Sequence, residues 1–289
     1  MIMRMPTWLR QELPQEGARR LIVRIRELGI TTVCQKAHCP NLSHCFQQGQ
    51  LTFMLLGDTC SRSCRFCAVD RTCLANLPVD KDEPRRVCEM VRQLGLDYVV
   101  ITSVTRDDLA DGGAGIFAET LKRLHLLNPD ARVEVLIPDF GGNLDCLKVV
   151  LDAQPTVVAH NLETVRGLYP EVRPQADYSR SLKILEWSRR IYPNCLTKSS
   201  IMVGLGETQR QIRQALLDLR DVGCDMVTIG QYLSPSPAHL PVKEFVLPDR
   251  FEVYKRIAYD LGFKAVASGP RVRSSYYAQR LYEECLCRM

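Results

Sequence analysis

The sequence predicts an α/β protein built as a partial, open (β/α)6 barrel of the TIM type. Short apolar runs alternate with helical patterns six or seven times from residue 51 onward. This alternation indicates parallel strands with helices outside, because parallel strands need crossover connections. The roughly 210 residues available for it lie at the small end for a closed barrel of eight units. A doubly wound open sheet is the second possibility.

The expected strands are short, apolar and separated by turn residues. They lie at 51–56, 98–102, 133–137, 156–159, 197–203, 226–229 and 265–267. The clearest helix between them covers 209–222, where Ile212, Leu216 and Leu219 recur on one face. A further helix is expected ahead of the first strand, at 16–28, with Gly29 as its stop.

The chain is expected to divide into three regions. Residues 1–50 form an N-terminal extension, 51–268 form the partial barrel, and 269–289 form a C-terminal cap. Both candidate folds bind ligands at the carboxyl ends of their parallel strands. Polar residues and cysteines that directly follow an expected strand are therefore the first candidates for a functional site.

The composition indicates a globular protein with a sizeable core. Its 289 residues are 46% hydrophobic and 25% charged, and the net charge of +5 comes from Lys and Arg spread along the chain. We therefore expect no nucleic-acid partner. Without an apolar run of about 18 residues or a signal-peptide pattern, we expect no membrane span and a cytoplasmic protein. A monomer is expected, since no feature of the sequence indicates an interface.

Thirteen cysteines in such a chain indicate metal binding rather than disulfides. Six of them form a first triplet, Cys34-x4-Cys39-x5-Cys45, and a second triplet, Cys60-x3-Cys64-x2-Cys67. Structural zinc and a [4Fe–4S] cube both need four ligands, so a triplet leaves one position for something else. An open iron position can bind a small molecule. The second triplet begins four residues after the first expected strand, which is the functional end of the sheet.

The two triplets allow two other interpretations. One is a zinc site completed by His38 or His44, although the spacing of the second triplet is unusual for zinc. The other is an electron carrier with two clusters, which would fill every cluster corner with cysteine and needs no α/β body of this size.

The second triplet, with Phe66 just before its last cysteine, resembles the signature of the radical S-adenosylmethionine (SAM) superfamily. The resemblance implies a [4Fe–4S] cluster on Cys60, Cys64 and Cys67. The amino and carboxylate groups of SAM would bind its fourth iron, with Phe66 as a neighbouring contact. One electron from the cluster would split SAM and give a 5′-deoxyadenosyl radical.

Almost the whole chain resembles the lipoyl synthase family. The likeness includes CQKAHCPNLSHCF at 34–46, TSVTRDDLADGGA at 102–114, HNLETV at 160–165, KSSIMVGLGET at 198–208 and GPRVRSSY at 269–276. It implies a second, auxiliary [4Fe–4S] cluster on Cys34, Cys39 and Cys45. Its fourth ligand would be the first serine of the Arg-Ser-Ser-Tyr segment, Ser274. The hard oxygen would be a weaker match to iron than a thiolate.

The implied reaction uses two SAM molecules per product. Each radical removes one hydrogen from an octanoyl-lysine, first at C6 and then at C8, and each carbon radical attacks a sulfide of the auxiliary cluster, giving the lipoyl group. The implied partners are an octanoylated carrier domain, such as a 2-oxoacid dehydrogenase E2 or the glycine cleavage H protein, and an electron donor such as ferredoxin or flavodoxin.

Some positions depart from the family pattern, including Gln35 after the first cysteine and Gln175 after Val-Arg-Pro. They leave open a related enzyme with another acyl carrier. A methylthiotransferase or another two-cluster radical SAM sulfur-inserting enzyme is the nearest alternative.

Candidate SAM contacts follow the second and fourth expected strands. Asp111 and Gly112 could approach the methionine amino group, because glycine allows close backbone contact. Asn161 and Glu163 offer a donor and acceptors for hydroxyl or amino groups. Arg173 could hold a carboxylate through two hydrogen bonds.

Other polar residues have no assigned role. Lys198 lies inside an expected strand and would need a buried partner, which the sequence does not identify. His125, His160 and His239 show no ligand-like spacing, so core or surface positions are expected for all three.

Overall fold

The computed structural model describes residues 4–9, 16–71 and 77–288. Seven strands form one parallel sheet in the order β1 to β7, with every strand beside its neighbours in the chain. They are β1 (Thr52–Leu55), β2 (Tyr98–Ser103), β3 (Arg132–Leu136), β4 (Val157–Ala159), β5 (Leu196–Val203), β6 (Met226–Gln231) and β7 (Ala265–Gly269). The order never reverses, and β1 does not pair with β7 within the described residues. The partial barrel is therefore confirmed, and the doubly wound alternative is wrong.

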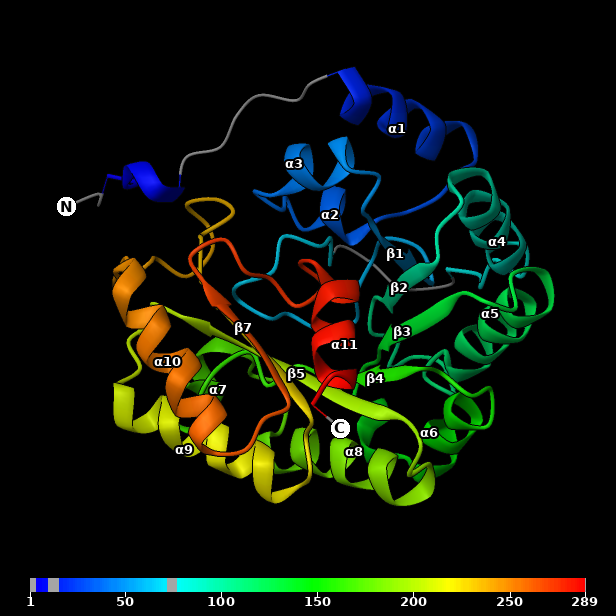
Figure 1. Cartoon of the computed structure of the whole chain (residues 1–289). Helices are drawn as coiled ribbons and strands as arrows, with labels where there is room; N and C mark the ends of the chain where they lie inside the picture. The colour runs from blue at the N-terminus through cyan, green and yellow to red at the C-terminus, as the bar shows by residue number, and fades with distance from the viewer. Residues whose placement is uncertain (1–3, 10–15, 72–76, 289) are drawn as a thin grey trace.

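Six helices connect the strands, so the barrel consists of six strand–helix units and a seventh strand. They are α4 (Glu83–Leu94), α5 (Ala114–Leu127), α6 (Leu144–Leu151), α8 (Tyr178–Ile191), α9 (Gln209–Asp221) and α10 (Pro248–Asp260). Figure 1 shows them around the outside of the sheet in chain order. Helix α9 begins with a capping box between Thr208 and Gln211 and buries the predicted apolar face. Shorter helices, η2 (Phe140–Gly142), η3 (Arg166–Leu168) and α7 (Tyr169–Val172), follow β3 and β4.

The N-terminal extension lies beside the open edge at β1. It contains η1 (Thr7–Leu9), α1 (Glu16–Glu27), α2 (Val33–Lys36) and α3 (Leu42–Gln47). Thr32 forms an antiparallel bridge with Phe53, and the Met54 amide donates to the carbonyl of Thr31 at 2.9 Å. In Figure 1 the extension occupies the part of the helical ring between α10 and α4. It therefore covers a strand edge that the open barrel would otherwise expose.

The last helix, α11 (Ala278–Leu286), packs against the amino end of the barrel. Its Leu281 and Cys285 share an apolar cluster with the first residues of four strands: Val157, Leu196, Met226 and Ala265. Side chains therefore fill the amino end of the barrel at β4 to β7.

Inside the barrel, Lys198 has the partner that its burial requires. Its Nζ lies 2.7 Å from Oε1 of Glu134 on β3, and both side chains are 1% exposed. The hydroxyl of Tyr98 donates to the other Glu134 oxygen at 2.9 Å. Burial and the nearby Glu134 carboxylate raise the pKa of Tyr98 well above its usual value.

None of the described helices has the length and apolar character needed to cross a lipid bilayer. Every cysteine in the described part of the chain is a free thiol.

Candidate active site

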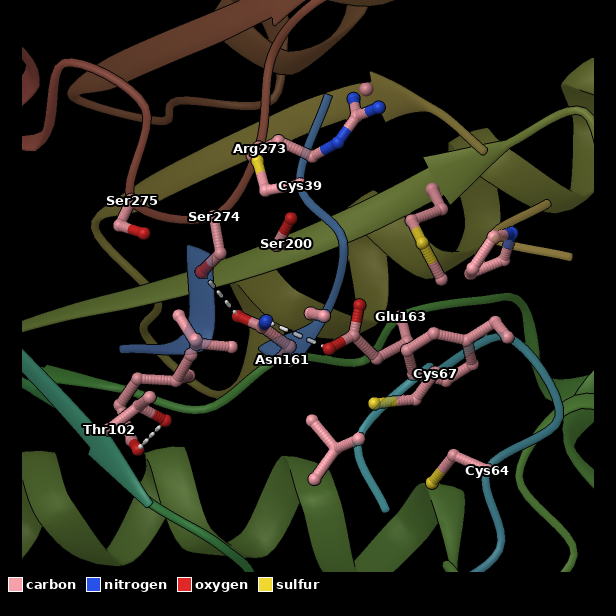
Figure 2. A pocket seen from close by; sticks show the side chains of 18 of the residues that line it. Cys39, Cys64, Cys67, Thr102, Asn161, Glu163, Ser200, Arg273, Ser274 and Ser275 are labelled. Carbon is pink, nitrogen blue, oxygen red and sulfur yellow. Dashed lines mark hydrogen bonds between the residues drawn. The ribbon is translucent and has the colours of Figure 1, made fainter. Parts of the chain in front are cut away.

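A cavity of about 470 Å³ lies at the carboxyl ends of the strands. This volume is within the range of about 300–1,000 Å³ typical of small-molecule sites. Cysteines of both triplets line it, together with loops that follow the strands and the C-terminal segment (Figure 2). Ten of the predicted site residues are in its wall: Cys34, Cys39, Cys60, Cys64, Phe66, Cys67, Asn161, Glu163, Arg173 and Ser274.

The second triplet lies on the loop after β1, as predicted, and backbone hydrogen bonds join it to three other segments. The Ser61 amide donates to the Thr105 carbonyl at 2.8 Å, and the Arg65 amide donates to Val172 at 2.9 Å. The Arg65 carbonyl in turn accepts from the Leu240 amide at 3.1 Å. Backbone bonds therefore fix the direction of the loop, and the Thr105 amide also donates to the Cys60 thiol at 3.4 Å.

Arg62, between the first two cysteines of this loop, is 7% exposed and carries two ion pairs. Its guanidinium lies 2.8 Å from Asp107 and 2.5 Å from Asp139, on the loops after β2 and β3. Burial pushes the pKa of Asp139 upward, but hydrogen bonds and the charge of Arg62 hold it at about 2. The pairs tie the second triplet to two neighbouring strands. Sequence reasoning missed Arg62, whose only signal was its place between two cysteines.

The thiols of the second triplet favour a bound cation. Burial raises the pKa of Cys67 to about 12, and burial also raises that of Cys64, against the charge and hydrogen bond of Arg173. Such thiols stay protonated at neutral pH unless positive charge compensates them, and bound metal deprotonates thiols. The soft thiolate donors match iron in a sulfur cluster. The residues therefore fit a [4Fe–4S] group.

Asn161 and Glu163, on the loop after β4, form a chain of hydrogen bonds with Ser274. The Ser274 hydroxyl donates to Asn161 Oδ1 at 2.9 Å, and Asn161 Nδ2 donates to Glu163 Oε1 at 2.9 Å. Figure 2 shows this chain leading from the C-terminal segment toward Cys67. Glu163 has a φ of 65°, and burial raises its pKa. A non-glycine residue in this conformation costs free energy, which is typical of functional sites.

A smaller cavity of about 240 Å³ adjoins the first triplet. All three cysteines of that triplet line it together with Ser275, whereas Ser274 is absent from its described wall. Ser275 Oγ accepts from Thr52 Oγ1 at 2.8 Å, and Thr52 also opposes the rise in the pKa of the Cys34 thiol. Burial, reinforced by the neighbouring thiolate of Cys39, raises the pKa of Cys34 to about 12. This triplet fits a cluster for the same reason as the second.

Close packing holds the C-terminal segment against the first triplet. Asn41 Nδ2 donates to the Arg271 carbonyl at 2.6 Å, and His44 Nε2 lies 2.8 Å from the Tyr277 hydroxyl. A Cβ on Gly230 of β6 would lie 2.0 Å from the Val272 carbonyl oxygen. Only glycine therefore lets the segment cross β6 at this distance.

Two of the predicted SAM contacts lie elsewhere. Asp111 and Gly112 do not line either described cavity. The Asp111 carboxylate instead accepts from the Gly113 and Gly115 amides, both at 2.9 Å, at the start of α5. This is a helix-capping role, and a contact of either residue with SAM stays a prediction.

His160 is buried, as expected for a core position, and it also lines the larger cavity. Its position directly after the fourth strand, next to Asn161, was the feature of the sequence that could have indicated a place at the cavity. In the described residues, no three His, Cys, Asp or Glu side chains lie close enough to share one metal ion. A [4Fe–4S] cluster does not require three ligands around one ion, because each thiolate binds a different iron atom of the cluster.

Comparison with known proteins identifies the family of this chain. The model of the radical SAM superfamily matches residues 54–219. The chain is 51% identical over 278 residues to lipoyl synthase of Caldanaerobacter subterraneus subsp. tengcongensis, covering 96% of this chain and 97% of that protein. It is 50% identical over 282 residues to lipoyl synthase of Thermus thermophilus, covering 96% and 87%.

Solved structures share the fold at low sequence identity. Methylornithine synthase has a TM-score of 0.59 at 14% identity, covering 90% of this chain and 73% of that one. HydG, a maturase of the [FeFe]-hydrogenase, has a TM-score of 0.58 at 15% identity, covering 74% and 50%.

Proposed function

Because this chain belongs to the lipoyl synthase family of the radical SAM superfamily, we propose that it inserts sulfur at C6 and C8 of a protein-bound octanoyl-lysine. The observation that carries the proposal is that cysteines of both triplets line one cavity, two from the first triplet and all three from the second. A reaction that makes a radical at one group and collects sulfur at another needs the substrate carbon between them.

Each triplet has a separate role in this proposal. When bound, the cluster on the second triplet supplies the electron that splits SAM, and the cluster on the first triplet supplies the sulfur. Cys60, Cys64 and Cys67 hold the former, and their loop is fixed by the pairs of Arg62 with Asp107 and Asp139.

The SAM molecule would contact the polar residues between the triplets. Glu163 and Asn161 offer oxygens for amino or hydroxyl donors, and both lie on the same side of the cavity as Cys67 (Figure 2). Arg173 already donates to the Asn161 carbonyl at 2.9 Å, and its charge lowers the pKa of the Cys64 thiol against the effect of burial. Its first role is therefore to position the Asn161 loop and to stabilise the thiolate. Phe66 packs against a small apolar cluster that includes Leu240 and so gives the cysteine loop an apolar support.

The contacts favour Ser275 rather than Ser274 as the fourth ligand of the auxiliary cluster. Both serines line the larger cavity, but only Ser275 also lines the small cavity with all three first-triplet cysteines. Its hydrogen-bond partner Thr52 also acts on the pKa of the Cys34 thiol. The Ser274 hydroxyl is engaged with Asn161, on the SAM side. This differs from the sequence prediction, because the order of two adjacent serines does not reveal which one faces the cysteines.

The octanoyl chain would enter from the carboxyl end, since α11 and its neighbours fill the amino end. Apolar side chains in the cavity wall, including Val33, Met54 and Met202, suit a hydrocarbon chain. A lipoyl-carrier protein is the substrate in this proposal. The E2 or H-protein identity of the carrier, a ferredoxin or flavodoxin donor, a monomeric state and a cytoplasmic location remain predictions.

The proposal is tested by anaerobic turnover of the reconstituted protein with SAM, dithionite and an octanoyl-lysyl peptide, read by mass spectrometry. We expect a product that has gained two sulfur atoms and lost two hydrogens. C60A should abolish formation of 5′-deoxyadenosine, whereas C34A should keep it and lose sulfur insertion. If C34A still made lipoyl peptide, the first triplet would not be the sulfur source. If the wild type formed 5′-deoxyadenosine but placed no sulfur in any octanoyl carrier, a methylthiotransferase or another sulfur inserter would be favoured.

The serine assignment needs its own pair of variants. S275A should lower the iron bound at the first triplet in a protein whose second triplet is replaced by alanine, and S274A should not. The readout is iron content together with the Mössbauer spectrum. The opposite ranking would restore Ser274 as the ligand.

A further inference from the structure

One carboxylate closes the base of the loop that carries the second triplet. The loop leaves β1 at Leu56 and Gly57 and ends where α4 begins, at Glu83. Glu83 Oε2 accepts from the Leu56 amide at 2.7 Å, and Oε1 accepts from the Gly57 amide at 3.3 Å. A single side chain therefore joins the two ends of the segment that holds all three cysteines of the triplet.

The chain turns sharply where this loop begins. Leu56 has a φ of 67°, and Gly57 has a φ of 82°. A leucine in the left-handed conformation costs free energy, so its surroundings must hold it there. The Leu56 side chain is 5% exposed and packs against Gly113 at the start of α5, where a Cβ would lie 2.2 Å from Leu56 Cδ1. The turn is therefore fixed by Glu83 on one helix and by the start of the next helix.

A similar turn after β5 shows what is special about Glu83. There the residue after the strand is Gly204, and its amide and that of Leu205 donate to the Glu207 carboxylate at 2.6 and 2.9 Å. Glu207 is only three residues from Gly204, so it stabilises its own turn and no long segment. Glu83 is 27 residues from Leu56, so its hydrogen bonds constrain a whole loop.

Glu83 lies outside the cavities that the loop enters. It is 6% exposed, and neither Glu83 nor Leu56 lines a described cavity. Both residues therefore act on a ligand only through the loop. We propose that Glu83, together with Leu56 packed on Gly113, is a positioning residue that sets the direction in which the second triplet enters the larger cavity. This inference deepens the proposed function and rests on it only for the identity of the group that the triplet binds.

Two variants test the two parts of this arrangement. E83Q keeps the size of the side chain but loses one acceptor, because its amide nitrogen would face a backbone N–H. L56G keeps the left-handed turn accessible and removes the packed side chain. The control is E89Q on the same helix, since the Glu89 side chain is 32% exposed and pairs with Arg92 at 2.8 Å.

The first measurement is hydrogen exchange in cluster-free protein, read by mass spectrometry of peptides that cover 56–67. Amides of this segment donate to carbonyls of other loops, so their exchange reports whether the loop stays in place. We expect E83Q to speed this exchange about tenfold, the effect of one lost hydrogen bond, and L56G to speed it as well. Peptides of α9, and all peptides of E89Q, should match the wild type. Unchanged exchange at 58–67 in both variants would overturn the inference. If E83Q does not fold, its α9 peptides also exchange faster, and L56G then decides.

The second measurement separates positioning from overall stability. In cluster-loaded protein whose first triplet is replaced by alanine, E83Q should release iron to a chelator about tenfold faster. It should also broaden the electron paramagnetic resonance spectrum of the reduced cluster, because a loop that is free at its base holds the cluster in more than one geometry. In protein whose second triplet is replaced by alanine, E83Q should release iron at the unaltered rate. Equally faster release from both triplets would overturn the inference, since it would mean a general loss of stability. Because hydrogen exchange is measured without a cluster, its result does not depend on whether the turnover assay supports the proposed function.

Discussion

Replacing Asp139 should cost more stability than replacing Asp107, although both carboxylates accept from the same Arg62. The Asp139 side chain is 0% exposed, and that of Asp107 is 43% exposed. The pKa of Asp139 falls from 3.8 to about 2 in the folded protein. One pKa unit corresponds to 1.36 kcal/mol, so D139N should lose about 2 kcal/mol at pH 7. An ion pair as exposed as that of Asp107 is worth about 1 kcal/mol or less, which sets the expectation for D107N.

The pH dependence of this contribution to stability follows from the direction of the pKa shift. A carboxyl whose pKa is lowered by folding contributes fully above its usual pKa near 4, and the contribution disappears as the pH falls through about 2. The assay is therefore urea unfolding at pH 7, followed by circular dichroism on the anaerobic, cluster-loaded protein. Equal losses in D139N and D107N, or no loss in D139N, would refute the reasoning that burial makes this pair strong.

Three further predictions concern the barrel and the first triplet. K198M should destabilise the protein by about 3–5 kcal/mol because it strands the Glu134 charge, and the thermal midpoint of K198M/E134L should lie above that of K198M. G230A should push Val272 away from β6, so iron bound at the first triplet should fall while 5′-deoxyadenosine formation persists. Because burial raises the pKa of two first-triplet thiols to about 12, cluster incorporation must release protons, and iron content after reconstitution should rise from pH 7 to pH 9. An iron content that stays the same between pH 7 and pH 9 would contradict this last prediction.

Periodicity was sufficient to predict the body of the fold. The expected strand at 197–203 corresponds to β5, Leu196–Val203, and the expected helix at 209–222 corresponds to α9, Gln209–Asp221. Both follow from local rules, namely an apolar run and a spaced apolar face between turn residues. The same rules placed the second triplet after β1, since the carboxyl end of a strand is fixed by its direction.

Pairings across the barrel could not be predicted, because they depend on register rather than on local pattern. Lys198 clearly needed a partner, but Glu134 is 64 residues away and meets it only when β3 and β5 curve around the lumen. Similarly, adjacent Ser274 and Ser275 both line the larger cavity, but only Ser275 also lines the smaller one, and this depends on how their segment crosses β6. Asp111 follows the second strand, as expected for a cavity residue, yet its carboxylate caps α5 rather than facing the cavity.

The site around the first triplet is built from both ends of the chain. Asn41 and Thr52 of the N-terminal part bond to Arg271 and Ser275 near the C-terminus. During synthesis, the cysteines leave the ribosome long before the segment that completes their pocket. A nascent chain that stops short of Arg271 would carry all six triplet thiols without this wall. The proposed cluster site at the first triplet would therefore be the last part to mature, and a cluster loaded before release would be exposed to water and oxidants.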